Sequence, residues 1–430
     1  MLTTGLILLF ATAGISAQEG ESQSQAELQG QVRKLVRQLG SSEVAQRDAA
    51  EDGLLELGPP ILDLLDEIPP QRDAEISTRL TRVREALYKQ AVEAATAATT
   101  VSIDADGTPL SELLALIEKQ TGNRIVDKRA EFGQEADDPK ITLQLTDAPF
   151  WQALDAVLDE AELTTYNYSG EKDDTALMAR PLGTMARAGT AAYSGVFRME
   201  PTMIEAVRDL RNPTAAALKL TVEVSWEPRL TPISISQSLD ALAVTNEDGE
   251  AIEIDGRLGS ISTDVNSAIA ATELEFPLVL PNRDVKKIAS LEGKLSVMVP
   301  GRVEKFTFGK LSQADDDEQK RGSATIILQT VRKNNAVYEV RMVLRFDKAA
   351  NALESHRGWV LNNKAYLLDG DGKQIEHAGY ETIRQTPNEV GFGYKFVIDG
   401  DIDDHRFVYE TPAAVVQKQI EYQLKDIPLP

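Results

Sequence analysis

The chain contains no cysteine, only three histidines, and aromatic residues at 6% of its 430 positions. The lack of cysteine excludes disulfide frameworks, cysteine-ligated metals, cysteine nucleophiles and the lipidated N-terminal cysteine of a bacterial lipoprotein. The domains must therefore be held together by ordinary hydrophobic cores, for which a hydrophobic content of 42% is sufficient.

Positive charge is also scarce, because 45 lysine and arginine residues stand against 68 aspartate and glutamate residues, giving a formal net charge of -23. A surface of this sign repels the phosphate backbone of nucleic acids. Nucleic acid is therefore excluded as an expected partner.

Long hydrophobic runs are missing except at the N-terminus, where residues 5–15 are apolar. Small residues from Gly14 to Ala17 and then a polar stretch follow this run. The order is typical of a secretory signal peptide over residues 1–17, although the first four residues include no lysine or arginine. The run is too short to cross a bilayer, and an uncleaved anchor is the alternative. We expect an exported protein of the periplasm or cell surface, with no integral membrane span once the signal is removed.

The usual catalytic patterns are also missing. The three histidines, His356, His377 and His405, all lie near the C-terminus beside charged residues in turn-like sequence, which favours solvated surface positions. The sequence contains no Gly-x-Ser-x-Gly elbow, no phosphate loop and no dinucleotide fingerprint. We expect no catalytic residues, no nucleotide cofactor and no enzymatic activity.

One acidic run is a candidate for calcium binding, since carboxylates at alternate positions can converge on that ion. Its candidate ligands are Asp399, Asp401, Asp403 and Glu410. The run departs from the EF-hand pattern because Asp404 replaces the glycine at position six and because strands flank it. An acidic hairpin loop is the alternative, so we expect no cofactor and keep calcium as a hypothesis.

After the N-terminal segment, the apolar residues recur at helical spacing and predict a helical domain over residues 27–98. The fourth helix is expected to begin near Asp73. The run Arg47 to Leu65 has small residues, a Gly-Pro turn and a leucine-rich helix, and it resembles a HEAT-like repeat. Repeats of that kind form binding surfaces, and a plain four-helix cap is the alternative.

Residues 100–182 contain the same unit twice, with Pro109 over Pro149. In each copy an alternating strand precedes an amphipathic helix and a short strand follows it. Thr108 and Asp147 stand where N-caps of the two helices would lie. The aligned apolar positions of the two helices are Leu110 and Phe150, Leu113 and Ala153, Leu114 and Leu154, and Ile117 and Val157. The sequence predicts a duplicated β-α-β domain.

Two parts of this domain carry a family resemblance: Thr121 to Val126 after the first helix, and Ile141 to Leu145 before the second. With the duplicated pattern, they make residues 101–181 similar to the short N-terminal domain of secretins and TonB-dependent receptors. The resemblance implies a periplasmic module that docks to other proteins. It does not carry over the pore or receptor function of that family.

From Leu218 to Trp226 the periodicity becomes alternating, which predicts a half-buried strand of an antiparallel sheet. Asp248-Gly249 and Asp371-Gly372 occupy matching places in two stretches of similar plan, over residues 190–312 and 321–430. The sequence predicts two tandem antiparallel β-sandwiches, which resemble immunoglobulin-like domains in strand count and spacing alone.

The expected fold is thus multidomain α+β: a HEAT-like helical domain, a duplicated β-α-β domain and two β-sandwiches. The expected function is a non-catalytic interaction or scaffold protein of the bacterial cell envelope, with envelope proteins as partners. One alternative is a hydrolase that acts on an envelope polymer through carboxylates of the β domains. Another is a calcium-stabilised adhesive module.

Overall fold

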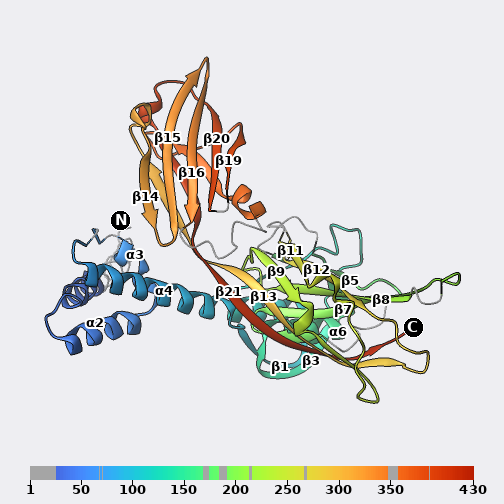
Figure 1. The fold of residues 1–430 in the computed structure, drawn as a ribbon. Coiled ribbons are helices and arrows are strands. Elements are labelled where there is room, and N and C mark those ends of the chain that lie inside the picture. The colour runs from blue at the N-terminus through green and yellow to red at the C-terminus, as the bar shows by residue number, and fades with distance from the viewer. Residues whose placement is uncertain are drawn as a thin grey trace, which may run out of the picture. The chain divides into compact units, whose positions relative to one another are not determined.

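The structure is a computed structural model that describes residues 26–66, 68–69, 71–167, 174–183, 191–212, 216–265, 269–346, 357–386 and 388–430. The chain divides into two compact units, Met1–Ala91 and Val92–Pro430. It is a mixed α+β protein in which antiparallel sheets predominate, as Figure 1 shows. The predicted signal peptide lies outside the described residues. Within the described residues, every helix is too short or too polar to cross a membrane.

The first unit is helical. Its elements are a helix over residues 26–38, α2 (Val44–Glu56), a 3-10 turn (Pro59–Ile61), α3 (Leu62–Asp66) and most of α4 (Ala74–Thr96). Helix α4 begins where the sequence predicts, because the Asp73 carboxylate accepts the backbone N–H groups of Glu75 and Ile76 at 2.8 and 3.3 Å. The buried apolar side chains include Val32, Val36, Leu39, Leu54, Ile61, Leu65, Leu80, Val83 and Leu87.

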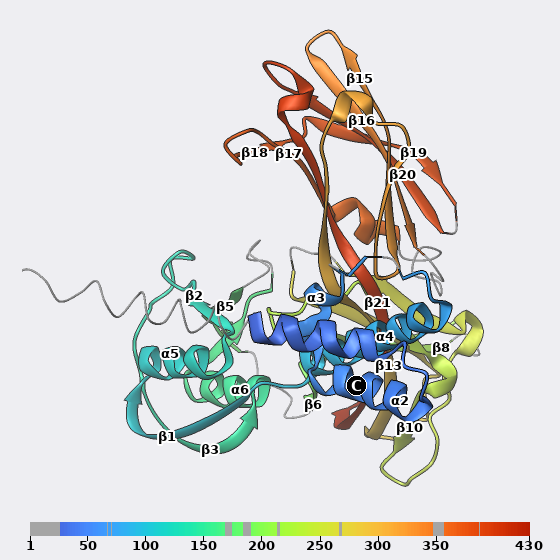
Figure 2. The same ribbon diagram turned by 90° about the vertical axis from the view of Figure 1, so that its left-hand side faces the viewer.

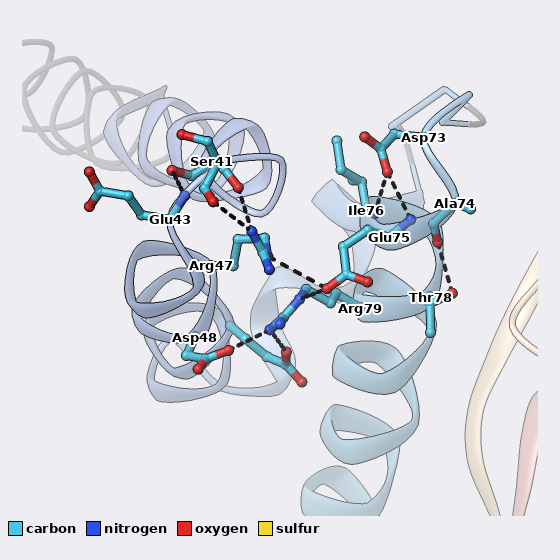
Figure 3. Close-up of polar contacts among 12 residues, drawn as sticks. Ser41, Glu43, Arg47, Asp48, Asp73, Ala74, Glu75, Ile76, Thr78 and Arg79 are labelled. Carbon is cyan, nitrogen blue, oxygen red and sulfur yellow. Dashed lines mark hydrogen bonds and ion pairs between the residues drawn. The ribbon is translucent and has the colours of Figure 1, made fainter.

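A buried arginine joins α2 to α4 (Figure 3). The Arg79 guanidinium contacts the carboxylates of Asp48, Glu51 and Glu75 at 2.9, 2.6 and 2.7 Å. Nearby, Arg47 donates to the Ser41 carbonyl oxygen at 2.8 Å, at the turn before α2. The buried guanidinium is thus paired within the unit, and removal of its partners would leave a costly unpaired charge.

The second unit begins with the duplicated domain, which we call the module (residues 100–182). Its elements are β1 (Thr100–Pro109), α5 (Leu110–Thr121), β2 (Arg124–Asp127), β3 (Lys140–Pro149), α6 (Phe150–Glu160), β4 (Leu163–Thr165) and β5 (Asp174–Ala179). Strands β1 and β3 form an antiparallel ribbon, and β5 lies between β2 and β4 in a second sheet. Figure 2 shows α5 and α6 between these two sheets. The aligned apolar positions predicted for the two helices are all buried in the module core.

The two copies exchange equivalent contacts. The first N–H of α5, at Leu110, donates to the carbonyl of Pro139 at 2.9 Å, and that of α6, at Phe150, donates to the carbonyl of Thr99 at 2.8 Å. Each acceptor directly precedes the other copy's first strand. The predicted caps Thr108 and Asp147 are wrong, because Pro109 and Pro149 hold the N-cap positions without a side-chain cap bond. The crossing strand supplies the acceptor that a capping side chain would otherwise provide.

A four-stranded sheet follows in the order β12-β8-β7-β6. Its strands are β6 (Ala192–Ser194), β7 (Phe197–Arg208), β8 (Ala216–Trp226) and β12 (Ala271–Leu278). The alternating side chains Leu218, Leu220, Val222, Val224 and Trp226 face the core, as predicted. The opposite face of β8 is not solvated as expected, since Thr221 and Ser225 are also buried. On the same face, Glu223 accepts a hydrogen bond from Asn167 of the module.

A seven-stranded sheet contains two very long strands, β13 (Lys287–Phe308) and β21 (Arg406–Pro428). They pair antiparallel from Lys287 opposite Pro428 to Phe308 opposite Phe407. The remaining strands of this sheet are β9 (Ser234–Ser238), β10 (Ala243–Asn246), β11 (Ser260–Asp264), β17 (Lys364–Leu368) and β18 (Gln374–Glu376). A five-stranded sheet has the order β14-β15-β16-β20-β19. Its strands are β14 (Asp317–Arg321), β15 (Ala324–Asn334), β16 (Val337–Phe346), β19 (Gly379–Gln385) and β20 (Glu389–Val397).

Strands β13 and β21 each contribute side chains to two hydrophobic cores. Leu295 of β13 and Leu424 of β21 pack in the core shared with β8 and β12, whereas Phe306 and Phe407 pack in the core shared with β16 and β20. The structure here differs from the predicted division at residues 312 and 321. The last part of β21 returns to the first core. The second core is therefore built from the end of β13, the chain between the two strands and the start of β21, and this continuous segment is inserted into the first core's part of the chain.

The two predicted Asp-Gly turns have the same local structure. Gly249 and Gly372 both adopt positive φ angles, 81° and 82°. In each turn a preceding side chain, that of Asn246 or Asp369, accepts the backbone N–H groups two and four residues later. The two Asp-Gly turns that the sequence places in matching positions therefore have the same backbone conformation and the same side-chain hydrogen bonds.

Candidate functional site at the polar junction of the module

Buried polar side chains gather where the module meets the four-stranded sheet β12-β8-β7-β6, and we call this region the junction. Its first centre is Glu227, which directly follows β8 and is 0% exposed. One carboxylate oxygen accepts the backbone N–H of Thr99 at 3.0 Å. The other accepts the Thr99 hydroxyl at 2.9 Å, the Asn123 amide at 2.9 Å and the Arg229 guanidinium at 2.8 Å. The charge is fully satisfied, so Glu227 ties the end of the sheet to the entry and the interior of the module.

Backbone contacts reinforce this connection. The Val196 N–H donates to the Thr96 carbonyl at 3.1 Å, and the Glu227 N–H donates to the Val196 carbonyl at 3.0 Å. The indole N–H of Trp151, on α6, also donates to the Val196 carbonyl, at 3.1 Å. Gly195 lies so close to this crossing that a β-carbon there would stand 2.3 Å from the Thr96 oxygen. The chain at 195–196 therefore requires glycine and is pinned from both sides.

The second centre is Arg198, a β7 residue that is only 2% exposed. Its Nε donates to Asp155 on α6 at 2.8 Å, and its terminal nitrogen contacts Glu200. The Tyr193 hydroxyl donates to the same Asp155 oxygen at 2.7 Å. The guanidinium also lies over the ring of Trp151, 5.8 Å from the centroid. This ion pair joins the module helix to the sheet in a setting where loss of either charge would be costly.

A third carboxylate, Glu223, approaches the same guanidinium at 3.5 Å. It accepts the amide of Asn167 at 2.9 Å and the hydroxyl of Ser225 at 3.0 Å. Burial raises the pKa of Glu223 by more than the Arg198 guanidinium lowers it. The centre therefore sets three carboxylates against one guanidinium.

The sequence contains partial signals for these residues. Asp155 interrupts the buried stripe of α6 one turn after Trp151, and Arg198 interrupts the apolar run from Val196 to Met199. A charged residue inside an apolar pattern indicates a buried partner. The sequence does not indicate which residues pair, and Glu227 carries no such signal because it follows the alternating pattern of β8.

The calcium candidates do not converge in the described structure. Asp401 accepts the Asp403 N–H at 3.0 Å. Asp403 accepts the Ser312 hydroxyl and, at 2.8 Å, the Ser312 backbone N–H, and these two hydrogen bonds lower the Asp403 pKa. Glu410 accepts the Tyr366 hydroxyl at 2.7 Å, and Asp399 is exposed. In the described residues no group of three or more potential ligands could hold a metal ion. Asp401 thus closes its own turn, Asp403 joins that turn to the one at Ser312, and Glu410 bonds across a strand pair.

The two described histidines, His377 and His405, contact different groups. The His405 ring lies 3.0 Å from the Asp401 carbonyl and is buried, and His377 packs on the rings of Tyr380 and Tyr394. His356 lies outside the described residues. The solvated positions expected from the sequence are therefore wrong for His405, because its turn folds over the imidazole.

Two open grooves lie away from the junction. One, of about 640 Å³, is lined by Glu292, Lys294, Glu421 and Gln423 beside Gly293 and Tyr422. The other, of about 400 Å³, lies beside Lys310, Asp317 and Glu318. Neither of these two grooves is lined by the junction residues.

Comparison of the chain with protein-family models, with curated proteins and with solved structures found no significant match.

Proposed function

We propose that this protein is an exported, non-catalytic scaffold or interaction protein of the bacterial cell envelope, and that the module is its docking part. The observation that carries the proposal is the junction, where Glu227 and Arg198 fix the module to the neighbouring sheet through buried contacts. A docking domain held in this way transmits its orientation to the rest of the second unit. Such rigidity lowers the entropic cost of binding.

The outer face of the β1–β3 ribbon supports the same proposal. Its side chains are exposed and polar, including Ser102, Asp104, Thr142 and Gln144. Within the described strands, β1 and β3 pair only with each other, so no further strand lies along their outer edges, although the Gln120 side chain bonds both backbone groups of Ser102. An exposed ribbon that is rigidly mounted offers both main-chain and side-chain contacts to a partner.

The resemblances named above fit this proposal. The module is similar to the short N-terminal domain of secretins and TonB-dependent receptors, the first unit is similar to a HEAT-like repeat, and the β cores are similar to immunoglobulin-like sandwiches. All three kinds of domain commonly bind other proteins. The acidic composition favours a partner with a basic surface.

The test is affinity capture from envelope extracts with the full chain as bait. The double variant Asp104→Arg, Gln144→Arg reverses the character of the ribbon face at two directly paired positions. Thr382→Arg, on the exposed strand β19, is the matched control. We expect a protein that the wild type and the control recover and the double variant loses. Equal recovery by all three chains would exclude the ribbon as the docking face.

One observation favours the alternative of an envelope-polymer hydrolase: the larger groove brings Glu292 and Glu421 to adjacent strands. However, Lys294 lies 2.7 Å from Glu421 and lowers its pKa, which is unfavourable for a general acid. Under this alternative, Glu292→Gln would abolish cleavage of envelope polymers by the purified chain. Absence of any cleavage by the wild type would remove the alternative.

A further inference from the structure

The pairing of β13 with β21 shifts register at one segment, residues 300–303 and 412–415, which we call the double bulge. The opposed pairs in this segment are Pro300 and Val415, Arg302 and Ala414, and Val303 and Pro412. Gly301 and Ala413 have no opposed residue in the ladder, so each strand holds one extra residue. Because the two extra residues offset each other, the pairs on either side follow the same register.

The double bulge lies between the two cores to which β13 and β21 contribute. Val299, directly before it in β13, is buried in the core shared with β8 and β12, the first core. Phe306, beyond it, is buried in the core shared with β16 and β20, the second core. Between them, Val303 is 56% exposed and Pro300 is half-buried, whereas Pro412 on β21 is buried. Strand β13 is therefore packed more loosely here than within either core.

Two prolines favour an irregular ladder at this place. Neither Pro300 nor Pro412 has a backbone N–H, so neither can donate a hydrogen bond to a neighbouring strand. Proline in sheets is confined to edges, strand starts and bulges. A bulge also leaves its extra residue unpaired and bends the strand. Fewer backbone hydrogen bonds thus resist bending of the ribbon at the double bulge than in its regular parts.

Polar contacts next to the double bulge hold each end of the ribbon to its own core. Thr411, fully buried on the side of the second core, accepts the side-chain amide of Asn363 at 2.9 Å. On the side of the first core, the Gln417 amide donates to the Ser296 hydroxyl across the ribbon. These contacts stiffen the ribbon on both sides, so bending is concentrated in the segment between them.

We propose that the double bulge is a hinge, about which the second core turns relative to the first core. Hinges are short segments that absorb a change of φ and ψ while the bodies on either side keep their packing. The buried side chains of the two cores form separate sets, so a turn at the hinge leaves each set together. The inference goes beyond the proposed scaffold function and does not rest on the docking role of the module.

Such a hinge would change how the scaffold holds its partners. The junction fixes the module to the sheet of the first core, and its orientation reaches the second core through the β13–β21 ribbon. A hinge in that ribbon lets one molecule hold the second core at more than one angle to a partner that the module has bound.

The test is double electron–electron resonance on the full chain, which contains no cysteine, so that two introduced cysteines carry the spin labels. Glu273→Cys on β12 with Lys395→Cys on β20 reports the distance between the two bodies, since both positions are exposed. Lys320→Cys with Lys395→Cys, both in the five-stranded sheet, is the reference within one body. We expect the distribution of distances across the double bulge to be at least about twice as wide as the reference distribution.

Deletion of both Gly301 and Ala413 makes the ladder continuous without changing the register elsewhere, so it should narrow the distribution across the hinge to the reference width. Deletion of Gly301 alone is the matched control. It displaces every later pair by one residue and turns core side chains to the surface, so it should lower the thermal midpoint, and the second deletion should restore that midpoint.

The proposal is overturned if the distribution across the double bulge is already as narrow as the reference, which would show a fixed bend. It is also overturned if the double deletion folds and leaves that distribution as wide as before, because the movement would then arise elsewhere. Should the double-deletion chain not fold, the comparison of the two label pairs in the undeleted chain decides the question.

Discussion

Glu227 and Thr99 are separated by 128 residues, yet the Glu227 carboxylate accepts both the backbone N–H and the hydroxyl of Thr99, at 3.0 and 2.9 Å. Thr99 precedes the first strand of the module, and Glu227 directly follows β8, whose core face is buried along its length. The contact therefore fixes where one domain begins relative to where a strand of the next one ends. Four predictions follow from this junction and from the shared long strands.

Glu227→Gln should destabilise the second unit by about 2–4 kcal/mol, because an amide nitrogen would face donor groups and Arg229 would lose its carboxylate. The measurement is the denaturant midpoint of the full chain. Glu253→Gln is the control, since Glu253 is exposed, and it should change the free energy of unfolding by less than about 0.5 kcal/mol. Equal midpoints for the two variants would contradict a structural role for the Glu227 contacts.

Gly195→Ala should be destabilising, by about 2–3 kcal/mol, because the new methyl group would clash with the Thr96 carbonyl and alanine disfavours the φ of 58° found there. The Thr96 oxygen cannot withdraw without losing its bond to the Val196 N–H. Gly370→Ala is the control, because no atom lies within 4 Å of a β-carbon at that position. A thermal midpoint unchanged by Gly195→Ala would mean that the chain at 195–196 is not pinned.

Glu223→Gln should remove part of the pH dependence of stability. Because the folded-state pKa of Glu223 is raised, its protonated form is favoured in the folded protein. The resulting contribution to stability is present below the pKa of the unfolded state and is lost as pH rises through the folded-state pKa. The variant, which stays neutral, should thus unfold at an equal or higher temperature than the wild type at about pH 7 and at the same temperature near pH 4.

The matched control for this pH dependence is Glu273→Gln, on the exposed face of β12. The difference in unfolding temperature between Glu273→Gln and the wild type should stay constant over the same pH range. A Glu223→Gln chain that unfolds at a lower temperature than the wild type at about pH 7 would reverse the assigned sign and show that the ion pair with Arg198 outweighs burial.

Leu424→Ala tests whether the C-terminal strand belongs to the first core. Leu424 is fully buried there, so the substitution should cost about 2–5 kcal/mol. Hydrogen exchange should quicken in β8 and β12, while β16 keeps its protection. Val303→Ala, at an exposed position of β13, is the control. Faster exchange confined to β16 would instead support two independent tandem domains.

Local periodicity allowed several features to be predicted from the sequence. The stripes of the two module helices, the alternation from Leu218 to Trp226 and the Asp-Gly turns depend on residues close together in the chain, and all are present in the structure. The mixed α+β class was predicted for the same reason. The HEAT-like, short N-terminal domain and immunoglobulin-like resemblances remain predictions.

The candidate junction could not be predicted in this way. Asp155 and Arg198 each interrupt an apolar pattern, but their pairing depends on how α6 lies against β7. The acidic run near Asp401 was a candidate for calcium binding because the spacing of its carboxylates resembles that of a calcium loop. Spacing along the chain does not fix the direction of side chains in a hairpin, and the carboxylates of Asp401 and Asp403 turn instead to nearby backbone N–H groups.

The sequence by itself determined which segments are helices and strands and which face of each is apolar, because those properties arise from a repeat of two or about 3.6 residues. Only the tertiary structure decided that β13 and β21 run through two cores and that Glu223, on the polar face of β8, is bonded to Asn167 of the module. An apolar face of a helix or strand must be buried, but many other elements could bury it equally well. Strand pairing and buried polar contacts between residues far apart in the chain decide which element does so.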